Sequence, residues 1–234
     1  MMPIGDDNSA NTIRPYVNYL LIAANILVFI FFQGLGGNQA FVMSFSTVPQ
    51  EIISGSDVIG GPTGLLPTPI PVWGTILTAM FMHGSIAHIA GNMLYLWIFG
   101  DNLENRMGHA KYLAFYIICG ILATLAHVFA SQALGRDMLI PSLGASGAIS
   151  GVLGGYLILF PRNKVRVLAL NMIINVPALV SLGIWIAMQL VSSMSMFGGE
   201  GSQGGVAYAA HIGGFLAGMI LVKFFTASAV PEAR

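Results

Sequence analysis

The feature that most constrains this chain is the scarcity of charge in its long apolar stretches. Of 234 residues, 8% are charged and 56% are hydrophobic, whereas a soluble domain carries about 25% charged residues. So few charges cannot cover a water-facing surface, and we therefore expect an integral membrane protein. The apolar stretches are long and lack the alternation of β-barrel strands, which predicts helical spans.

Composition narrows the possible chemistry. The formal net charge is zero, so nothing favours a nucleic-acid partner. The single cysteine, Cys119, excludes a disulfide within the chain, and its apolar surroundings favour a packing role. The 29 glycines indicate that helices approach one another closely.

Six apolar stretches predict an all-α, polytopic membrane protein with six transmembrane helices. Residues 1–15 are expected to form a mobile cytoplasmic segment, 16–226 the membrane domain and 227–234 a short tail. A cleaved signal peptide is the alternative for the first stretch, but no A-x-A site follows it. The long loop 34–72 is expected to lie in the membrane interface. The spans are expected at about 16–33, 73–100, 112–134, 146–160, 167–196 (bent near Pro177) and 205–225.

Basic residues predict the orientation in the membrane. Six spans put both termini on one side, and with the N-terminus inside, only Arg136 among the nine Lys and Arg residues lies outside. Basic loops resist translocation, so we expect both termini in the cytoplasm. The compact chain favours a bacterial plasma membrane. The basic residues expected inside are Arg14, Arg106, Lys111, Arg162, Lys164, Arg166, Lys223 and Arg234.

This topology brings several polar side chains to a similar depth near the outer face. Ser146 begins the fourth span, His211 lies two turns into the sixth, and His88 and Asn92 share one face of the second. The serine span is only about 22 Å long, too short to cross a core of about 30 Å. Its outer end is therefore expected to lie below the surface, within protein and reached by water.

Glycines explain how a serine and a histidine on different helices can touch. Gly147, Gly151 and Gly155 repeat every four residues on the serine span, and Gly214 and Gly218 do so on the sixth. Such faces let two backbones approach closely. We therefore expect the two spans to pack against each other.

The side-chain types suit nucleophilic catalysis. A serine hydroxyl needs a base to take its proton, and neutral histidine is that base near pH 7. Attack on an amide forms an oxyanion that needs fixed donors. Ser146 N–H, His88 and Asn92 are the candidates, and no carboxylate is available to orient His211. The hypothesis is a Ser146–His211 dyad.

Simpler interpretations exist for the same residues. A serine in a glycine-rich membrane helix often serves packing or bonds to the preceding turn. His88 and His211 are alternative metal ligands, although no HExxH motif or third acidic ligand accompanies them, so no metal or cofactor is expected. His83 is expected to be a structural hydrogen-bond partner. Glu104 and Arg106 are expected to form an ion pair or helix caps.

Four motifs in order resemble the rhomboid family of intramembrane serine proteases. They are His83-x4-His88-x3-Asn92, an E-x-R-x-G at Glu104–Gly108, G-x-S-G at Gly144–Gly147, and Ala210-His211-x-Gly213-Gly214. A lone G-x-S-G is weak, whereas four motifs in register over about residues 70–225 are specific.

The resemblance implies a function and roles for the matching residues. It implies a six-helix bundle that cleaves single-span transmembrane proteins near the outer membrane face. Ser146 would be the nucleophile, His211 the base, and His88 and Asn92 would flank the oxyanion. Loop 34–72 would lie in the interface, and the fifth span would be a lateral gate. Two positions depart from the family: Ser150 replaces an aromatic that stacks on the histidine, and Trp73-Gly74 replaces a Trp-Arg pair.

Two other functions fit some of these features. A non-enzymatic rhomboid-like protein that binds transmembrane clients is the first alternative, but such proteins usually lack the serine or the histidine, and both are present. A small transporter is the second. It predicts an inverted repeat and a polar lining through the inner half, and the sequence has neither.

Overall fold

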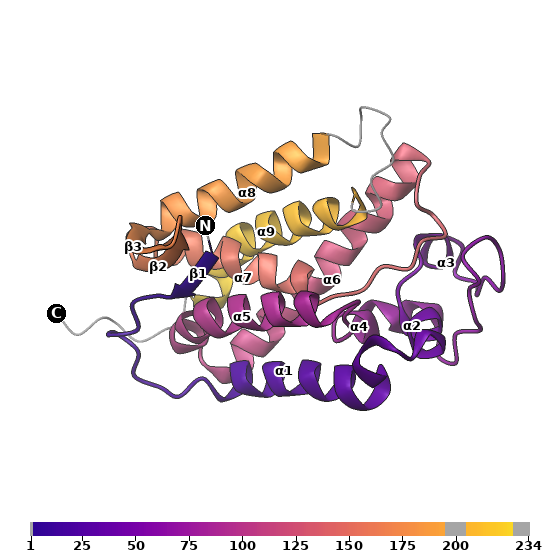
Figure 1. The fold of residues 1–234 in the computed structure, drawn as a ribbon, viewed down its shortest axis with the longest axis horizontal. Helices are drawn as coiled ribbons and strands as arrows, with labels where there is room; N and C mark the ends of the chain where they lie inside the picture. The colour runs from indigo at the N-terminus through magenta and orange to yellow at the C-terminus, as the bar shows by residue number, and fades with distance from the viewer. Residues whose placement is uncertain (1, 195–204, 227–234) are drawn as a thin grey trace.

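The structure, a computed structural model, describes residues 2–194 and 205–226. Its long helices run side by side (Figure 1). They are α1 (Tyr16–Leu27), which continues into the π-helical turn η1 (Val28–Phe32), α5 (Ile86–Met107), α6 (His109–Leu134), α7 (Ser146–Leu159), α8 (Ala178–Met194) and α9 (Gly205–Thr226). The end of the expected fifth span, residues 195–196, and the expected tail 227–234 lie outside the described residues.

Helix α7 is the centre of the bundle. It packs against α5, α6, α8 and α9, and each of its residues from Gly147 to Tyr156 is buried. A helix that is apolar on all sides is stable only when other helices surround it. Ser146, its first residue, therefore begins a helix that other helices of the bundle surround.

The boundaries of α5 and α6 follow from local capping. Ser85 is extended, and its hydroxyl accepts a hydrogen bond from His88 N–H at 3.1 Å, which caps α5. Gly108 separates α5 from α6 with a φ of 78°, and Gly135 ends α6 with a φ of 61°. The prediction of one continuous span over 73–100 is wrong, because the chain leaves helix α4 (Thr75–Ala79) and begins α5 anew after Ser85.

The long first loop contains short helices at the end of the bundle opposite the strands (Figure 1). Asn38 caps α2 by accepting from Phe41 N–H at 3.1 Å. Ser142, just before the serine helix, forms an isolated β-bridge with Thr47. The loop is thus attached to the chain that leads into α7. Its elements are η2 (Gly34–Gly36), α2 (Gln39–Phe45), α3 (Pro49–Ser54) and η3 (Val72–Gly74).

The all-α prediction is wrong in one region, where three antiparallel strands form a sheet in the order β1–β2–β3. The strands are β1 (Met2–Gly5), β2 (Lys164–Ala169) and β3 (Met172–Pro177). The first third of the expected fifth span, 167–196, is thus part of a hairpin, and α8 begins only after Pro177. The physical reason is the alternation of β-branched residues such as Val165 and Val167, which favours strands. Leu170 and Asn171 have φ of 48° and 62°, as a two-residue hairpin turn requires.

The N-terminal segment, expected to be mobile, instead packs against the bundle. Asp6 Oδ2 accepts hydrogen bonds from Tyr156 O–H at 2.6 Å and from Asn102 Nδ2 at 2.7 Å. Thr12 N–H donates to Asn105 Oδ1 at 2.8 Å. The segment thereby joins α5, α7 and β2 at one end of the bundle.

Two helices in the described part of the chain are long and apolar enough to cross a membrane. They are α6 and residues Tyr208–Thr226 of α9. Tyr16–Phe32, α7 and Ala178–Ser193 are apolar but shorter. The six-span count stays a prediction.

Candidate active site

The candidate site is built on Ser146 and His211, which come from neighbouring helices. Ser146 Oγ and His211 Nε2 lie 2.8 Å apart, within hydrogen-bond distance. A Cβ atom added at Gly214 would overlap Gly147 O, and one added at Gly218 would overlap Gly151 O. The backbones of α7 and α9 therefore touch along their glycine faces, and this contact lets a short serine side chain reach a histidine on the next helix.

The second nitrogen of His211 is also occupied. His211 Nδ1 lies 2.8 Å from Gln189 Oε1 on α8. An amide oxygen only accepts hydrogen bonds, so Nδ1 carries the ring proton and Nε2 is free to accept from Ser146 O–H. The ring of Trp185, one turn earlier on α8, lies 6.0 Å from the His211 ring between centroids. Helix α8 therefore fixes both the tautomer and the orientation of the histidine.

Ser150 has a local role. It is buried, and its hydroxyl donates to Ser146 O at 2.6 Å within α7. In the described part of the chain, its hydroxyl makes no hydrogen bond to His211. In many members of the family that the sequence resembles, an aromatic residue at the position of Ser150 stacks on the histidine. In this structure Trp185 and Gln189 lie beside His211 instead. Sequence analysis missed both residues; the signal was a glutamine four residues after a tryptophan on an otherwise apolar helix face.

Gly144 allows His88 to approach the serine. Gly144 has a φ of 134°, a conformation that side chains other than glycine rarely adopt. A Cβ atom there would lie 3.1 Å from His88 Nε2 and 3.6 Å from Ser146 Oγ. Gly84 N–H makes a long hydrogen bond of 3.4 Å to His88 Nδ1, which leaves the proton on Nε2. His88 therefore presents a donor on the side of the serine.

Asn92 lies one turn after His88 on α5 and contacts His83. Asn92 Nδ2 donates to His83 Nε2 at 2.9 Å, so the second N–H of the same amide is available for a ligand. His83 is fully buried, and Gln33 accepts from its N–H at 2.8 Å and donates to its C=O at 2.9 Å. Gln33, which caps the end of η1, thereby supports the site through His83.

These side chains line a pocket of about 270 Å³ between α5, α7, α8 and α9. His88, Asn92, Ser146, Gln189 and His211 contribute its polar groups, and Tyr95 and Trp185 are among its apolar walls. The polar groups converge on one side of a mostly apolar wall. Apolar walls with a few polar groups are typical of a ligand-binding pocket.

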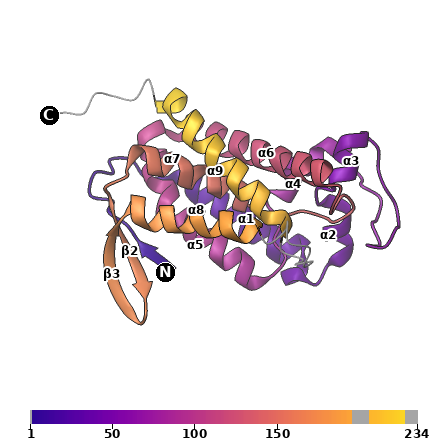
Figure 2. The same cartoon turned by 90° about the horizontal axis from the view of Figure 1, so that it is seen from above.

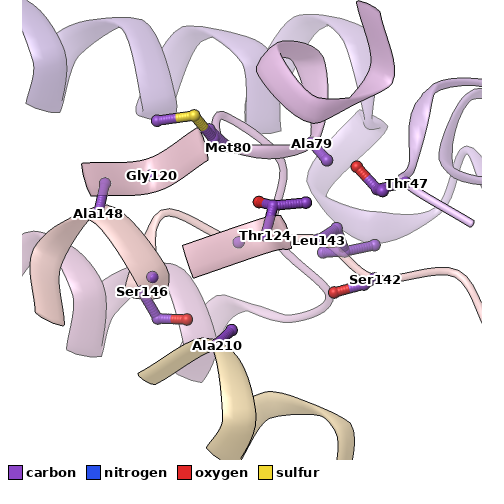
Figure 3. Close-up of a pocket in the computed structure, with 12 residues that line it drawn as sticks. Thr47, Ala79, Met80, Gly120, Thr124, Ser142, Leu143, Ser146, Ala148 and Ala210 are labelled. Carbon is purple, nitrogen blue, oxygen red and sulfur yellow. The ribbon is translucent and has the colours of Figure 1, made fainter. Parts of the chain in front are cut away.

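A second, smaller cavity of about 40 Å³ lies on the other side of Ser146. Figure 3 shows Ser146 and Ala210 at one end and Thr47, Thr124 and Ser142 towards the other. A cavity needs about 10–15 Å³ per water molecule and polar partners. This one has room for water beside the serine.

Glu104 and Arg106 lie at the opposite end of α5 from His88. The buried Glu104 carboxylate accepts from Val17 N–H at 2.9 Å and Asn18 N–H at 2.7 Å, which caps α1, and it also pairs with His109. Arg106 is not among the carboxylate's partners in the described part of the chain. Within residues 2–194 and 205–226, no three His, Cys, Asp or Glu side chains are grouped so as to hold a metal ion.

The described helices are largely apolar, and two of them hold a serine and a histidine at hydrogen-bond distance. The Rhomboid domain family matches residues 71–228. The chain therefore belongs to the rhomboid family, whose members are embedded in membranes, and the resemblance noted in the sequence is confirmed.

Relatives with known names support the same assignment. The chain is 32% identical over 160 residues to "Rhomboid protein 1, mitochondrial" of Saccharomyces cerevisiae, covering 68% of this chain and 44% of the relative. It is 29% identical over 191 residues to "Rhomboid protease GluP" of Bacillus subtilis, covering 80% of this chain and 33% of the relative. The human "Presenilin-associated rhomboid-like protein, mitochondrial" is 30% identical over 152 residues, covering 65% of this chain and 35% of the relative. The chain thus spans less than half the length of each of these relatives.

Proposed function

We propose that this chain is an intramembrane serine endopeptidase. The observation that carries the proposal is the 2.8 Å contact between Ser146 Oγ and His211 Nε2, with the other nitrogen of the histidine bonded to Gln189. A serine becomes nucleophilic when a correctly oriented base accepts its proton. The name of the Bacillus subtilis relative, a rhomboid protease, agrees with this chemistry.

The reaction proceeds in two steps. Ser146 Oγ attacks the scissile carbonyl carbon while His211 Nε2 takes the hydroxyl proton. His211 then gives that proton to the leaving amine, which breaks the C–N bond and leaves an acyl-enzyme. Water, for which the small cavity beside Ser146 has room, attacks the ester with His211 again as base, and the serine is restored.

The oxyanion formed in each step needs donors that are fixed in advance. Three groups are the proposed donors: the backbone N–H of Ser146 at the start of α7, the Nε2–H of His88, and the second N–H of the Asn92 amide. His83 and Gly144 support them, the first by holding Asn92 and the second by leaving room for His88. No metal or cofactor takes part in this mechanism.

The substrates are proposed to be single-span transmembrane proteins. The pocket is bounded by α8 on one side and α5 on the other, so a segment from the lipid reaches Ser146 by passing between these helices. Peptide bonds inside a helix are enclosed by their own turns, so the segment must unwind first. Substrates with helix-destabilising residues near the outer membrane face are therefore favoured.

We also propose that both termini face the cytoplasm, because the distribution of basic residues favours this side. A cysteine at Ser56, in the exposed part of loop 34–72, should react with an impermeant maleimide added outside cells, whereas one at Lys164 should not. The reverse pattern would overturn the orientation. A bacterial plasma membrane is proposed as the location, and the relatives include both bacterial and mitochondrial proteins.

The decisive experiment is labelling by a fluorophosphonate probe in detergent, with cleavage of a single-span substrate measured in parallel. Wild type should be labelled and active, and Ser146→Ala and His211→Ala should be neither. Ser146→Ala removes one oxygen from a partly enclosed position, so its thermal stability should stay close to that of wild type. Cleavage by the Ser146→Ala variant would exclude the dyad.

The second candidate is a non-enzymatic protein that binds transmembrane clients in the same pocket. The apolar wall of the pocket, which includes Tyr95 and Trp185, is the observation that favours it. If wild type binds the transmembrane substrate but is neither labelled nor active, this candidate replaces the protease.

A further inference from the structure

The hairpin formed by β2 and β3 extends sideways from the end of the bundle that carries the N-terminal strand (Figure 2). Its base is firmly attached, because Val165 and Val167 are fully buried in the main hydrophobic core and β1 pairs with β2 at Pro3 and Val167. Beyond Val167, β1 pairs with β2 once more, at Met2 and Leu168, and both of these side chains are exposed. The hairpin therefore has an anchored base and a projecting tip, which we define as residues 168–174.

The tip carries apolar side chains on both faces. Cross-strand partners share a face. One face therefore carries the pairs Val167↔Ile174 and Ala169↔Met172, and the other carries the pair Leu168↔Ile173. Leu170, at the turn, is 93% exposed and Ile173 is 66% exposed. No charged residue occurs between Leu168 and Ile174. A protein partner docked on one side would cover only half of these side chains, whereas hydrocarbon surrounds a tip on both faces.

Basic residues lie at the base of the hairpin. Arg162, Lys164 and Arg166 are exposed, and they precede the apolar tip in the sequence. Asp7 lies near Lys164 and Asp6 near Arg166, so part of this positive charge is offset locally. A segment with apolar side chains at its end and Lys or Arg behind them has the composition of elements that bind the surface of an anionic membrane.

The position of the hairpin agrees with this composition. It connects α7 to α8, and it leaves the bundle roughly across the direction of the helices (Figure 2). In a protein embedded in a bilayer, that direction runs along the membrane plane at the level where the helices end. The outer edge of β3 has unpaired backbone groups, which cannot be satisfied in the hydrocarbon core. The hairpin tip can therefore enter the bilayer only as far as the boundary between headgroups and acyl chains.

We propose that the hairpin tip inserts into the interfacial layer of the membrane that holds the bundle, with Arg162 and Lys164 at anionic lipid headgroups. The occupant of the apolar tip is thus lipid, and the proposal requires membrane embedding but not protease activity. Since Pro177 directly precedes α8, the insertion also fixes the start of the helix that carries Gln189. The lipid composition at this end of the bundle then acts on a wall of the pocket.

The test measures the depth of a spin label at the tip. Ile173→Cys and, as a control at the same end of the bundle, the exposed Ala110→Cys are made in a Cys119→Ala background and reconstituted at one copy per nanodisc with 30% anionic lipid. Collision with oxygen reports the apolar layer, and collision with a water-soluble nickel chelate reports solvent. The label at Ile173 should collide with oxygen and be protected from nickel, while the label at Ala110 should remain accessible to nickel.

Two results would overturn the assignment. Equal nickel access at both positions would mean that the tip lies in water. The second result is that the nickel chelate reaches the Ile173 label in single-copy nanodiscs but not in vesicles with several copies. That would mean that a second copy of the protein, and not lipid, covers the tip. Both labelled variants are compared with wild type by circular dichroism and size-exclusion chromatography, so that misfolded protein is not scored.

A separate experiment tests the contribution of the basic residues. Arg162→Gln with Lys164→Gln, added to the Ile173 label, should lower the ratio of inserted to exposed tip in anionic nanodiscs by roughly fivefold per charge removed. The same change should have no effect in zwitterionic nanodiscs. An equal loss in both lipids would exclude recognition of anionic headgroups.

Discussion

Gln189 and His211 come from different helices, α8 and α9, and their side chains meet at 2.8 Å between Oε1 and Nδ1. The bond has the geometry of the base–orienter contact found in catalytic triads, but the orienter is a neutral amide. Such a group fixes the tautomer and the ring orientation without adding a negative charge to stabilise the imidazolium ion. It also means that any displacement of α8 changes the environment of His211.

Replacing Gln189 should therefore lower turnover more than it changes substrate binding. Gln189→Leu keeps the size of the side chain but removes the acceptor, so the imidazole is free to rotate or to adopt the other tautomer. We expect kcat to fall about 10- to 100-fold, less than the roughly 10²–10⁴-fold supplied by a general base, with KM nearly unchanged. Steady-state cleavage of a transmembrane substrate in vesicles measures both constants.

The controls separate orientation from packing. Gln189→Glu keeps an acceptor at the same reach and should retain more activity than Gln189→Leu. Met188→Leu, at a half-exposed position on the same helix, should be neutral. If Gln189→Leu is as active as wild type, the glutamine has no positioning role.

Asn92 is expected to contribute to turnover through its free N–H group. Asn92→Ala removes one proposed oxyanion donor, so kcat should fall by roughly 10²–10³-fold with a much smaller change in KM. The variant also frees His83, which Asn92 contacts at 2.9 Å, so His83→Ala is measured beside it. Unchanged turnover for Asn92→Ala would remove it from the oxyanion role. Because His83 is proposed to act by holding Asn92, His83→Ala should lose turnover too, but less than Asn92→Ala.

The glycine contact between α7 and α9 should be sensitive to a single methyl group. A Cβ atom at Gly218 would overlap backbone atoms of Gly151, which cannot move aside as a side chain can. Gly218→Ala should therefore destabilise the protein by about 1–3 kcal/mol and separate Ser146 from His211. Thermal unfolding in detergent and fluorophosphonate labelling measure the two effects.

A matched control substitution, also glycine to alanine, is available on α8. A Cβ atom at Gly183 would meet nothing within 4 Å, so Gly183→Ala should be neutral or stabilising by up to about 1 kcal/mol through helix propensity. Equal stability and labelling in the Gly183→Ala and Gly218→Ala variants would show that the close approach of α7 and α9 is not needed.

The sequence predicted what depends on spacing within one helix. His88 and Asn92 are four residues apart, and Gly147 and Gly151 repeat at the same interval, so each pair could be assigned to one face without knowing the fold. The partner of His211 could not be assigned in this way, because Gln189 approaches it from another helix and depends on how α8 is rotated.

The hairpin was missed for a different reason. An apolar run such as Val167–Val176 is compatible with a strand or a membrane helix, and in an apolar chain the length of the whole run favoured the helix. The β-branched residues and the turn at Leu170 and Asn171 were the signal for strands. The docking of the N-terminal segment depends on β2, so it could not be predicted while that strand was read as part of a span.

The attachment of the N-terminal strand should depend on pH through Asp6. Burial raises the pKa of the Asp6 carboxyl from 3.8 to about 6, an effect that hydrogen bonds from Tyr156 and Asn102 and the nearby Arg166 only partly oppose. Between these two values the docked segment binds more protons than the detached one, so docking becomes more favourable as the pH falls from about 7 towards 4.

Hydrogen exchange at the amides of Ile4 and Gly5, corrected for the intrinsic pH dependence of exchange, measures this docking. Protection should increase as the pH is lowered from 7.5 to about 5, because the neutral carboxyl loses the cost of burying a charge. Asp6→Asn keeps a neutral group of the same shape, so its protection should already be high at pH 7.5 and change less with pH. A wild-type protection that falls on acidification would mean that the charged form of Asp6 is the one that holds the strand to α5 and α7.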